Sequence, residues 1–192
     1  MKIKRAVAYL IDFLIVYIIA AMIFSSPLFK DSYSSYQKAS EDYFNYIIET
    51  GSEELDYDIE LQHLYDISKY SQPLMIINSG LIIIYFGIIV YMLNGQTLGK
   101  KIMKLKVVSI DKEKLNPNLF MLRAIILTNL LPKIASIISL ALLGKTNWII
   151  AENIITFVSN SVLFLIIGCM IFRDDERGLH DVICKTDVIS TK

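Results

Sequence analysis

A carboxylate lies inside the first apolar segment of the chain. The run from Ala6 to Phe24 is long enough for a helix across a membrane; it contains Asp12 and follows directly on Arg5. An acidic side chain at the centre of a bilayer costs roughly 2.5 kcal/mol or more, so it is retained there only with a partner or a function. Any fold of this chain must supply one of the two for Asp12.

The apolar content and segment lengths indicate a membrane protein. The chain is 54% hydrophobic with a mean hydropathy of +0.50, above the roughly 45–50% of soluble domains. A membrane-spanning helix needs about 20 mostly apolar residues, and the segments that qualify are 6–24, 73–93, 119–143 and 148–172. Polar side chains interrupt the last two, and such positions usually face neighbouring helices. We therefore predict an all-α protein in which residues 1–192 form a single membrane domain, a bundle of four transmembrane helices.

The distribution of basic residues predicts the side on which each loop lies. Lys and Arg number three in residues 1–5, six in 94–118 and four in 173–192, whereas 25–72 holds three Lys and ten acidic residues. Segments rich in Lys and Arg stay in the cytoplasm. Both termini of this multi-pass protein are therefore predicted to be cytoplasmic, and 25–72 is predicted to lie outside.

The outer segment, 25–72, has the pattern of a helical hairpin. Apolar and aromatic residues recur at helical spacing on both sides of Gly51, a residue type that commonly ends a helix. We predict an extracytoplasmic helical insertion between the first two spans. Its tyrosines are more typical of a packed or headgroup-level face than of a cation site.

The loop after the second predicted span carries a glycine motif, Gly95-Gln96-Thr97-Leu98-Gly99-Lys100. Its glycine spacing and the residue after Lys100 do not fit a phosphate-binding P-loop. We expect Gly95 to end the span and Gly99 to permit a tight turn. Lysines near an anionic surface contribute about 1 kcal/mol each, so the loop is predicted to bind anionic lipid headgroups through Lys100, Lys101, Lys104 and Lys106.

Two segments near the ends of the cytoplasmic regions predict a small interfacial element. Apolar and basic residues alternate from Met103 to Val107, which is the period of a strand. A strand reaching Ile110 could pair with the C-terminal residues Thr186 to Ser190. A short helix is expected just before the second strand, at Leu179 to Ile183.

No catalytic, metal or cofactor site can be assembled from the sequence. Cys169 and Cys184 lack metal-ligand spacing, and His180 beside Asp181 lacks a third ligand or a nucleophile. The zero net charge gives no indication of a nucleic-acid partner. We expect a protein that is not an enzyme and has no cofactor, with the lipid bilayer and its anionic headgroups as partners.

Three features together resemble the RDD family of bacterial integral membrane proteins. They are Arg5 with Asp12, the loop 95–100 leading into 105–108, and the closing Gly178-Leu179-His180-Asp181 with Thr186, Val188 and Ile189. The resemblance covers all but 25–72 and implies a bacterial inner-membrane protein. The family is named for an arginine and two aspartates, so the resemblance implies Arg5, Asp12 and Asp181 for these positions. Ligand transport has been proposed for the family, and some relatives resemble cation/proton antiporters.

Helix geometry leaves the partner of Asp12 open. Arg5 and Asp12 share one helix face but lie about 10 Å apart along the axis, too far for direct pairing. Arg123 enters the third predicted span at a similar depth. Our hypothesis is a buried Asp12–Arg123 pair near the inner leaflet, with Arg5 and Asp181 paired at the interface below it.

Two functions remain compatible with such buried charges. In the first, the protein transports a cation or small solute, for example by cation/proton exchange with Asp12 in the pathway; a homodimer would widen a conduit that four spans make narrow. In the second, the charges only fix helix packing, and the protein is a membrane scaffold that binds anionic lipid and docks a partner through the outer hairpin. The sequence names no transported ligand.

Overall fold

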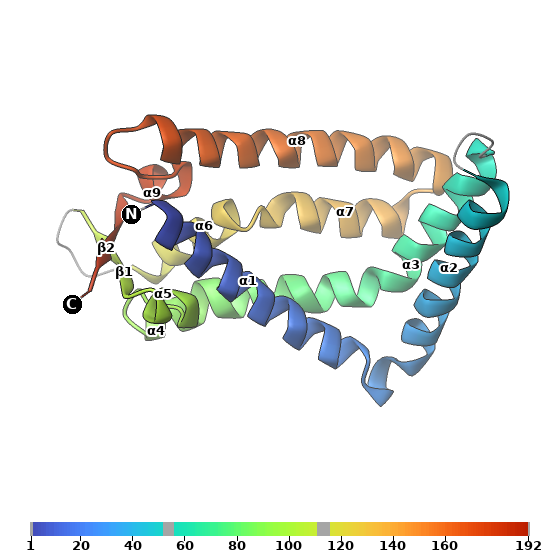
Figure 1. Ribbon diagram of the computed structural model, residues 1–192, viewed down its shortest axis with the longest axis horizontal. Helices are drawn as coiled ribbons and strands as arrows, with labels where there is room; N and C mark the ends of the chain where they lie inside the picture. Colours follow the sequence, from blue (N-terminus) through green and yellow to red (C-terminus); the bar gives the residue numbers. More distant parts are fainter. Residues whose placement is uncertain (1, 52–55, 111–115, 192) are drawn as a thin grey trace.

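Long helices run side by side in this protein, with a small sheet at one end (Figure 1). The computed structural model describes residues 2–51, 56–110 and 116–191. The elements are α1 (Lys2–Phe24), η1 (Pro27–Phe29), α2 (Lys30–Thr50), α3 (Tyr57–Ile82), η2 (Ile83–Ile89), α4 (Val90–Met92), α5 (Leu98–Ile102), β1 (Leu105–Ser109), α6 (Pro117–Leu127), α7 (Leu130–Leu142), α8 (Lys145–Phe172), α9 (Leu179–Ile183) and β2 (Thr186–Ser190). We call the end that carries both termini and the two strands the sheet end, and the opposite end, where α2 ends and α3 begins, the hairpin end.

The predicted membrane class is confirmed. Three helical segments of the described residues, Lys2–Phe24, Tyr57–Met92 and Lys145–Phe172, are long and apolar enough to cross a membrane. The pair α6 and α7 gives a fourth span if it is counted as one, but it is bent by 66°. The break falls at Asn129, whose φ of 55° is left-handed, a conformation that Asn adopts more readily than most residues. The third predicted span is therefore broken into two shorter helices.

The second span begins earlier than the sequence predicts. Hydropathy places its start at Pro73, but α3 is already helical from Tyr57 and contains Pro73 in its interior. It then continues without a turn through η2, a π-helical segment, into α4. The second helix of the outer hairpin and the second membrane span are thus one continuous rod.

The outer hairpin is held together by its aromatic residues. α2 packs along the first turns of α3, and Gly51 ends α2 with φ +74° and an N–H donated to Ile47, as predicted. The His63 ring lies 5.2 Å from that of Tyr46 and 5.6 Å from that of Tyr43. These side chains pack between the two helices, which agrees with the expected packing role of the tyrosines.

The predicted strand pair forms at the sheet end. β1 and β2 are antiparallel, with Leu105 opposite Ser190 and Ser109 opposite Thr186. Their inner faces are part of a core with the surrounding helices, made of Ala8, Val90, Leu105, Val107, Phe120 and Val188. The predicted helix α9 immediately precedes β2. The sheet end thus ties α1, the loop after α4 and the C-terminal segment into one unit.

Candidate functional site

Asp12 is buried and fully hydrogen-bonded by neutral donors. The Tyr85 hydroxyl and the Gly99 amide each donate to Asp12 Oδ1 at 2.7 Å. The Thr97 hydroxyl donates to Oδ2. The residue is only 1% exposed. We call Asp12, Tyr85, Thr97 and Gly99 the Asp12 cluster; it fastens the loop after the second span onto α1.

Gly95, Gln96 and Thr97 of the glycine loop each make a different structural contact. Gly95 has φ +89°, and a Cβ there would lie 2.3 Å from the carbonyl oxygen of Val107. The Gln96 side chain donates to the carbonyl of Leu105 at 3.0 Å. Thr97 caps α5, because its hydroxyl accepts from the Lys100 amide at 3.2 Å. The loop therefore holds β1 on one side and Asp12 on the other.

Gly99 does not form the predicted tight turn. It lies inside α5, and a Cβ there would lie 2.2 Å from the backbone oxygen of Ala8 and 2.9 Å from the Asp12 carboxylate. The absence of a side chain is what lets α5 approach α1 closely enough for the Gly99 amide to reach Asp12. The role of Gly99 depends on the packing of α5 against α1, and the local sequence carries no information about that contact.

Gly99→Ala should therefore strongly destabilise the protein. The contact is with backbone, which cannot rotate away, so α5 has to move off α1 and the Asp12 hydrogen bonds are lost; we expect a loss of about 3 kcal/mol. Thermal unfolding in detergent micelles measures it. Gly80→Ala is the matched control, since nothing lies within 4 Å of a Cβ in that helix. Equal stability of the two variants would contradict this account.

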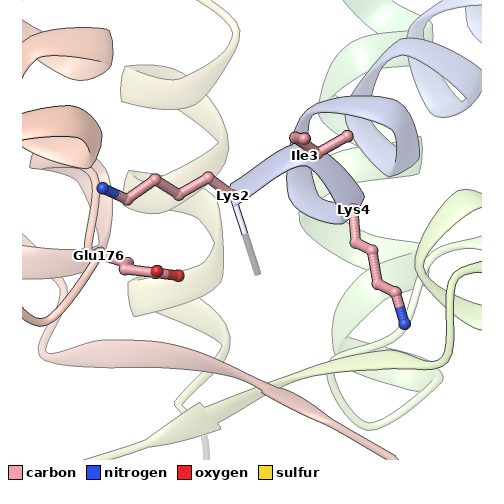
Figure 2. A pocket seen from close by; sticks show the side chains of 4 residues that line it. All are labelled: Lys2, Ile3, Lys4 and Glu176. Atoms are coloured by element: carbon pink, nitrogen blue, oxygen red, sulfur yellow. The ribbon is translucent and has the colours of Figure 1, made fainter.

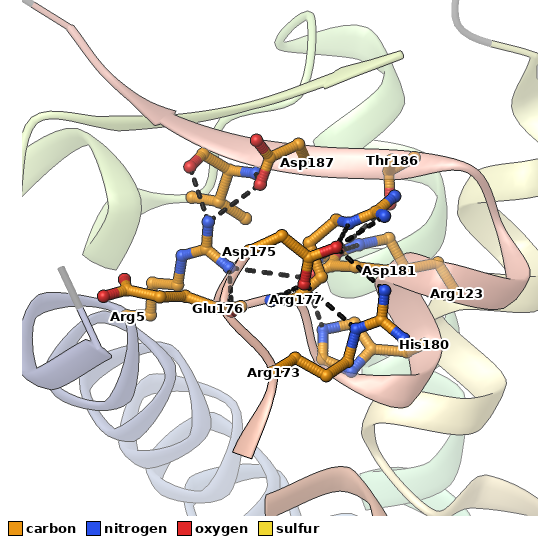
Figure 3. A network of polar contacts seen from close by, with 11 residues as sticks. Arg5, Arg123, Arg173, Asp175, Glu176, Arg177, His180, Asp181, Thr186 and Asp187 are labelled. Carbon is orange, nitrogen blue, oxygen red and sulfur yellow. Dashed lines mark hydrogen bonds and ion pairs between the residues drawn. The ribbon is translucent and has the colours of Figure 1, made fainter. Parts of the chain in front are cut away.

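A second buried cluster is centred on Asp181 in α9 (Figure 3). Arg123 of α6 contacts Asp181 Oδ1 through Nε and Nη2, both at 2.9 Å. The Thr186 hydroxyl donates to the same oxygen at 3.0 Å, and His180 Nε2 lies 3.3 Å from Oδ2. Arg5 Nη1 lies 3.8 Å from Oδ2. We call these five residues the Asp181 cluster.

Arg5 joins the N-terminal helix to the C-terminal strand. Its Nη2 donates to Asp187 Oδ1 at 2.9 Å and to the Val188 carbonyl at 2.7 Å. Its Nη1 donates to the Glu176 carbonyl at 2.8 Å. The proximity of Arg5 to Asp181 agrees with the hypothesis made from the sequence, but the direct carboxylate partner of Arg5 is Asp187.

The hypothesised Asp12–Arg123 pair is not formed. Asp12 accepts from two hydroxyls and an amide, whereas Arg123 is paired with Asp181. Matched depth in the membrane and opposite charge were the basis for pairing them, and neither determines which faces of two helices meet. The two buried carboxylates therefore belong to separate clusters. Asp12 is bound by uncharged donors, and Asp181 is bound mainly by arginine.

Electrostatics fixes the protonation states in the Asp181 cluster. Burial raises the pKa of Asp181, but Arg123 and His180 lower it more, so the net pKa is well below its usual range. Burial also lowers the pKa of His180, an effect that Arg123 and Lys100 reinforce and Asp181 opposes. At neutral pH the cluster thus holds an ionised Asp181 beside a neutral imidazole.

Lys100 is buried, which corrects its predicted place at the membrane surface. It is 8% exposed, whereas Lys101 and Lys104 are exposed and Lys106 is half-buried. Burial and, less strongly, Arg123 lower the pKa of Lys100, Asp12 and Asp181 partly offset them, and the net pKa is about 7. Among the described residues, no carboxylate forms an ion pair with its ammonium group. The headgroup role predicted for these lysines therefore suits the outer three better than Lys100.

A cavity of about 610 Å³ opens beside the Asp181 cluster. Its polar lining consists of Lys2, Arg5, Lys100, Arg123, His180 and Asp181. Its remaining walls are almost entirely apolar and come mainly from α1 and α8, with Leu10, Phe13, Leu163, Ile166 and Ile167 among them. A small-molecule site commonly has a volume of about 300–1,000 Å³, apolar walls and a few polar groups. Asp12 does not line this cavity.

A shallower hollow adjoins the cavity at the start of α1 (Figure 2). Its lining is Lys2, Ile3, Lys4 and Glu176, and its volume is about 370 Å³. Figure 2 shows the side chains of Lys2 and Lys4 pointing to opposite sides of α1. Lys2 and Ile3 line both spaces, so the cavity has an edge at the outer surface of the sheet end.

The sequence does not point to Tyr85 or Asp187, and it offers His180 only as a metal or catalytic candidate and as part of the 178–181 motif. Tyr85 is one of several tyrosines in apolar segments, and only the π-helical segment η2 aims its hydroxyl at Asp12. His180 lacked metal-ligand neighbours, but its position beside Asp181 in a helix-and-strand pattern was a usable signal. Within the described residues, no group of three His, Cys, Asp or Glu side chains could hold a metal ion.

Comparison with known proteins tests the family resemblance. Searches among curated proteins and among solved structures gave no match. The sequence model of the RDD family matches residues 3–185, nearly the whole chain, and this range includes the glycine loop, the Asp12 cluster and all of the Asp181 cluster except Thr186. The chain belongs to the RDD family.

Proposed function

We propose that this membrane protein binds an anionic solute in the cavity at its sheet end. The observation that carries the proposal is the charge of the lining, which among the described residues contains Lys2, Arg5, Lys100 and Arg123 but a single carboxylate, Asp181. Arg123 is already paired with that carboxylate, and Arg5 with Asp187. Lys100 is left as a buried amine with no ion-pair partner in the described part of the chain, and an anion would supply that partner and favour its charged form.

Cation/proton exchange through Asp12 finds less support in this geometry. A carboxylate that carries a cation has to exchange its ligands with water or with the ion. Asp12 does not line the cavity, and its carboxylate already accepts hydrogen bonds from three donors. Its contacts support a packing role, the structural alternative for this residue.

Transport of the bound solute is a second candidate, favoured by the broken span. Discontinuous helices with polar residues at the break are common at the binding sites of transporters. The α6–α7 bend places Asn129 so that its amide donates to the Ser159 carbonyl and hydroxyl of α8, both at 2.7 Å. Movement of α6 against α7 would alter the wall that Arg123 and Leu127 contribute to the cavity. By the distribution of basic residues, the sheet end would face the cytoplasm.

Binding of glycerol 3-phosphate to the purified protein tests the anion site. We expect Lys100 to tighten binding roughly tenfold at about pH 6 relative to about pH 8, because the anion favours its charged form. The phosphate probe titrates in the same range, with a second pKa of about 6, and this opposes the effect. The charged groups acting on Lys100 are Arg123, Asp12, Asp181 and, when protonated, His180. Lys100→Met should weaken binding roughly tenfold at about pH 6 and leave only the pH dependence of the phosphate itself, so the difference between the two proteins gives the contribution of Lys100.

Lys101→Met is the matched control, because this neighbouring lysine is exposed and should leave affinity unchanged. Equal effects of the two variants, or binding of Na⁺, K⁺ or Li⁺ in place of the anion, would overturn the proposal. Proteoliposomes loaded with the same anion distinguish transport from binding alone. Efflux of the anion that Lys100→Met reduces supports transport, and retention of the anion supports binding alone. Cation flux that Asp12→Asn abolishes would restore the cation-exchange hypothesis.

A further inference from the structure

We infer that the cavity ligand is a membrane lipid with an anionic headgroup, entering sideways between α1 and α8. This inference rests on the proposed anion site and adds the nature of the molecule that carries the anion. Its starting point is the division of the cavity into a basic end beside the Asp181 cluster and an apolar part that extends along the two helices.

The basic end and the apolar part together have about the length of one leaflet. The lining of α1 extends from Lys2 to Phe13, which is about 16 Å along a helix axis. Half of a hydrocarbon core of about 30 Å is a similar distance. The basic end therefore lies where a headgroup would lie if the apolar part were level with the acyl chains.

The cavity wall between α1 and α8 is open to the surrounding bilayer. These two helices make few direct contacts with each other, and Figure 1 shows α8 along one edge of the bundle. Lining residues on both sides of the seam are well exposed, with Leu10 at 60%, Ile167 at 44% and Ile171 at 54%. A water-soluble anion would leave this apolar opening between α1 and α8 uncovered, whereas the acyl chain of a lipid would cover it.

The basic end of the cavity contains a buried ammonium group. Lys100 lines the cavity and is 8% exposed, and no carboxylate of the described residues forms an ion pair with it. Phosphatidylglycerol carries one anionic phosphate group in its headgroup. That phosphate would be the ion-pair partner of Lys100, while the acyl chains would lie along the apolar part of the cavity.

The test uses the full protein in neutral detergent and three probes. Dioleoyl phosphatidylglycerol, dioleoyl phosphatidylcholine and glycerol 3-phosphate are titrated separately, with bound lipid counted by native mass spectrometry. We expect one phosphatidylglycerol per chain, bound at least roughly tenfold more tightly than either other probe. Ile167→Trp, which fills the seam, should remove that preference for the lipid over glycerol 3-phosphate.

Phe164→Trp is the matched control on the same helix, because Phe164 is 76% exposed and does not line the cavity. It should bind phosphatidylglycerol as the wild type does. If glycerol 3-phosphate binds as tightly as phosphatidylglycerol, or if Ile167→Trp and Phe164→Trp behave alike, the lipid inference fails while the anion site stands. If the wild type binds neither anionic probe, both the inference and the proposed function fail.

Discussion

Asp181→Asn should lower the free energy of unfolding by about 3–5 kcal/mol, the usual cost of removing one partner from a buried ion pair. The carboxylate neutralises Arg123 directly and lies near Arg5. Asparagine keeps the size of the side chain but leaves these guanidinium groups buried beside an uncharged amide. Thermal or denaturant unfolding in detergent measures the loss.

Asp175→Asn is a closely matched control. Asp175 also has two arginine partners, with Arg173 at 2.8 Å and Arg177 at 2.6 Å, but its side chain is 36% exposed. Solvent screens such a pair, so its removal should cost much less stability than removal of the Asp181 carboxylate. A similar loss in the two variants would mean that burial does not set the strength of the Asp181 cluster.

Asp181→Asn should also change how the stability of the protein depends on pH. The folded pKa of Asp181 is well below its usual range, so in acid the unfolded chain takes up a proton before the folded chain does. The stability from Asp181 is present above the unfolded pKa of about 3.9 and is lost as the pH falls toward the folded pKa. Wild-type stability should therefore fall more steeply below about pH 4 than that of Asp181→Asn.

Asp12→Ala should be comparably damaging, with a loss of about 3–5 kcal/mol, because hydrogen bonds to a charged group contribute roughly 1.5–3 kcal/mol each. The change strands the donors of Tyr85, Thr97 and Gly99 around a small cavity. Tyr85→Phe and Thr97→Val each remove one donor and should have smaller effects. Tyr17→Phe, on the same helix at a position 50% exposed, should be nearly neutral.

Combining variants distinguishes the two clusters from the pairing expected from sequence. Asp12→Ala and Arg123→Gln should lose stability additively to within about 0.5 kcal/mol, whereas Arg123→Gln and Asp181→Asn should show a coupling of about 0.5–3 kcal/mol. Coupling of Asp12 with Arg123 as strong as that of Arg123 with Asp181 would contradict the observed separation.

Much of the architecture could be predicted because it depends on local patterns. The membrane spans follow from apolar length, the strand pair from alternation at 103–107, and the end of α2 from Gly51. The start of the second span was wrong by more than four turns, since hydropathy detects the apolar part of α3 and not its polar extension from Tyr57. The bend at Asn129 was marked by polar residues, but its 66° angle depends on packing against α8.

The partners of the buried charges could not be predicted for a different reason. Arg123 and Asp181 are 58 residues apart, and their contact requires the C-terminal segment to fold back onto α6. Asp12 has neutral donors from η2 and the glycine loop, and such donors leave no charge pattern in a sequence. In the sequence Lys100 cannot be told apart from the neighbouring lysines. It is buried because α5 approaches α1 closely, a tertiary contact.

The sequence alone thus determined that Asp12 needs a partner or a function and that the chain crosses a membrane, because hydrocarbon imposes these requirements on charged residues and on segment length. Its motifs, independently, resemble the RDD family. Only the tertiary structure decided which groups meet. A hydrogen bond or ion pair depends on distances of a few ångströms between helix faces, and these are set by packing contacts such as Gly99 against Ala8 that no single segment encodes.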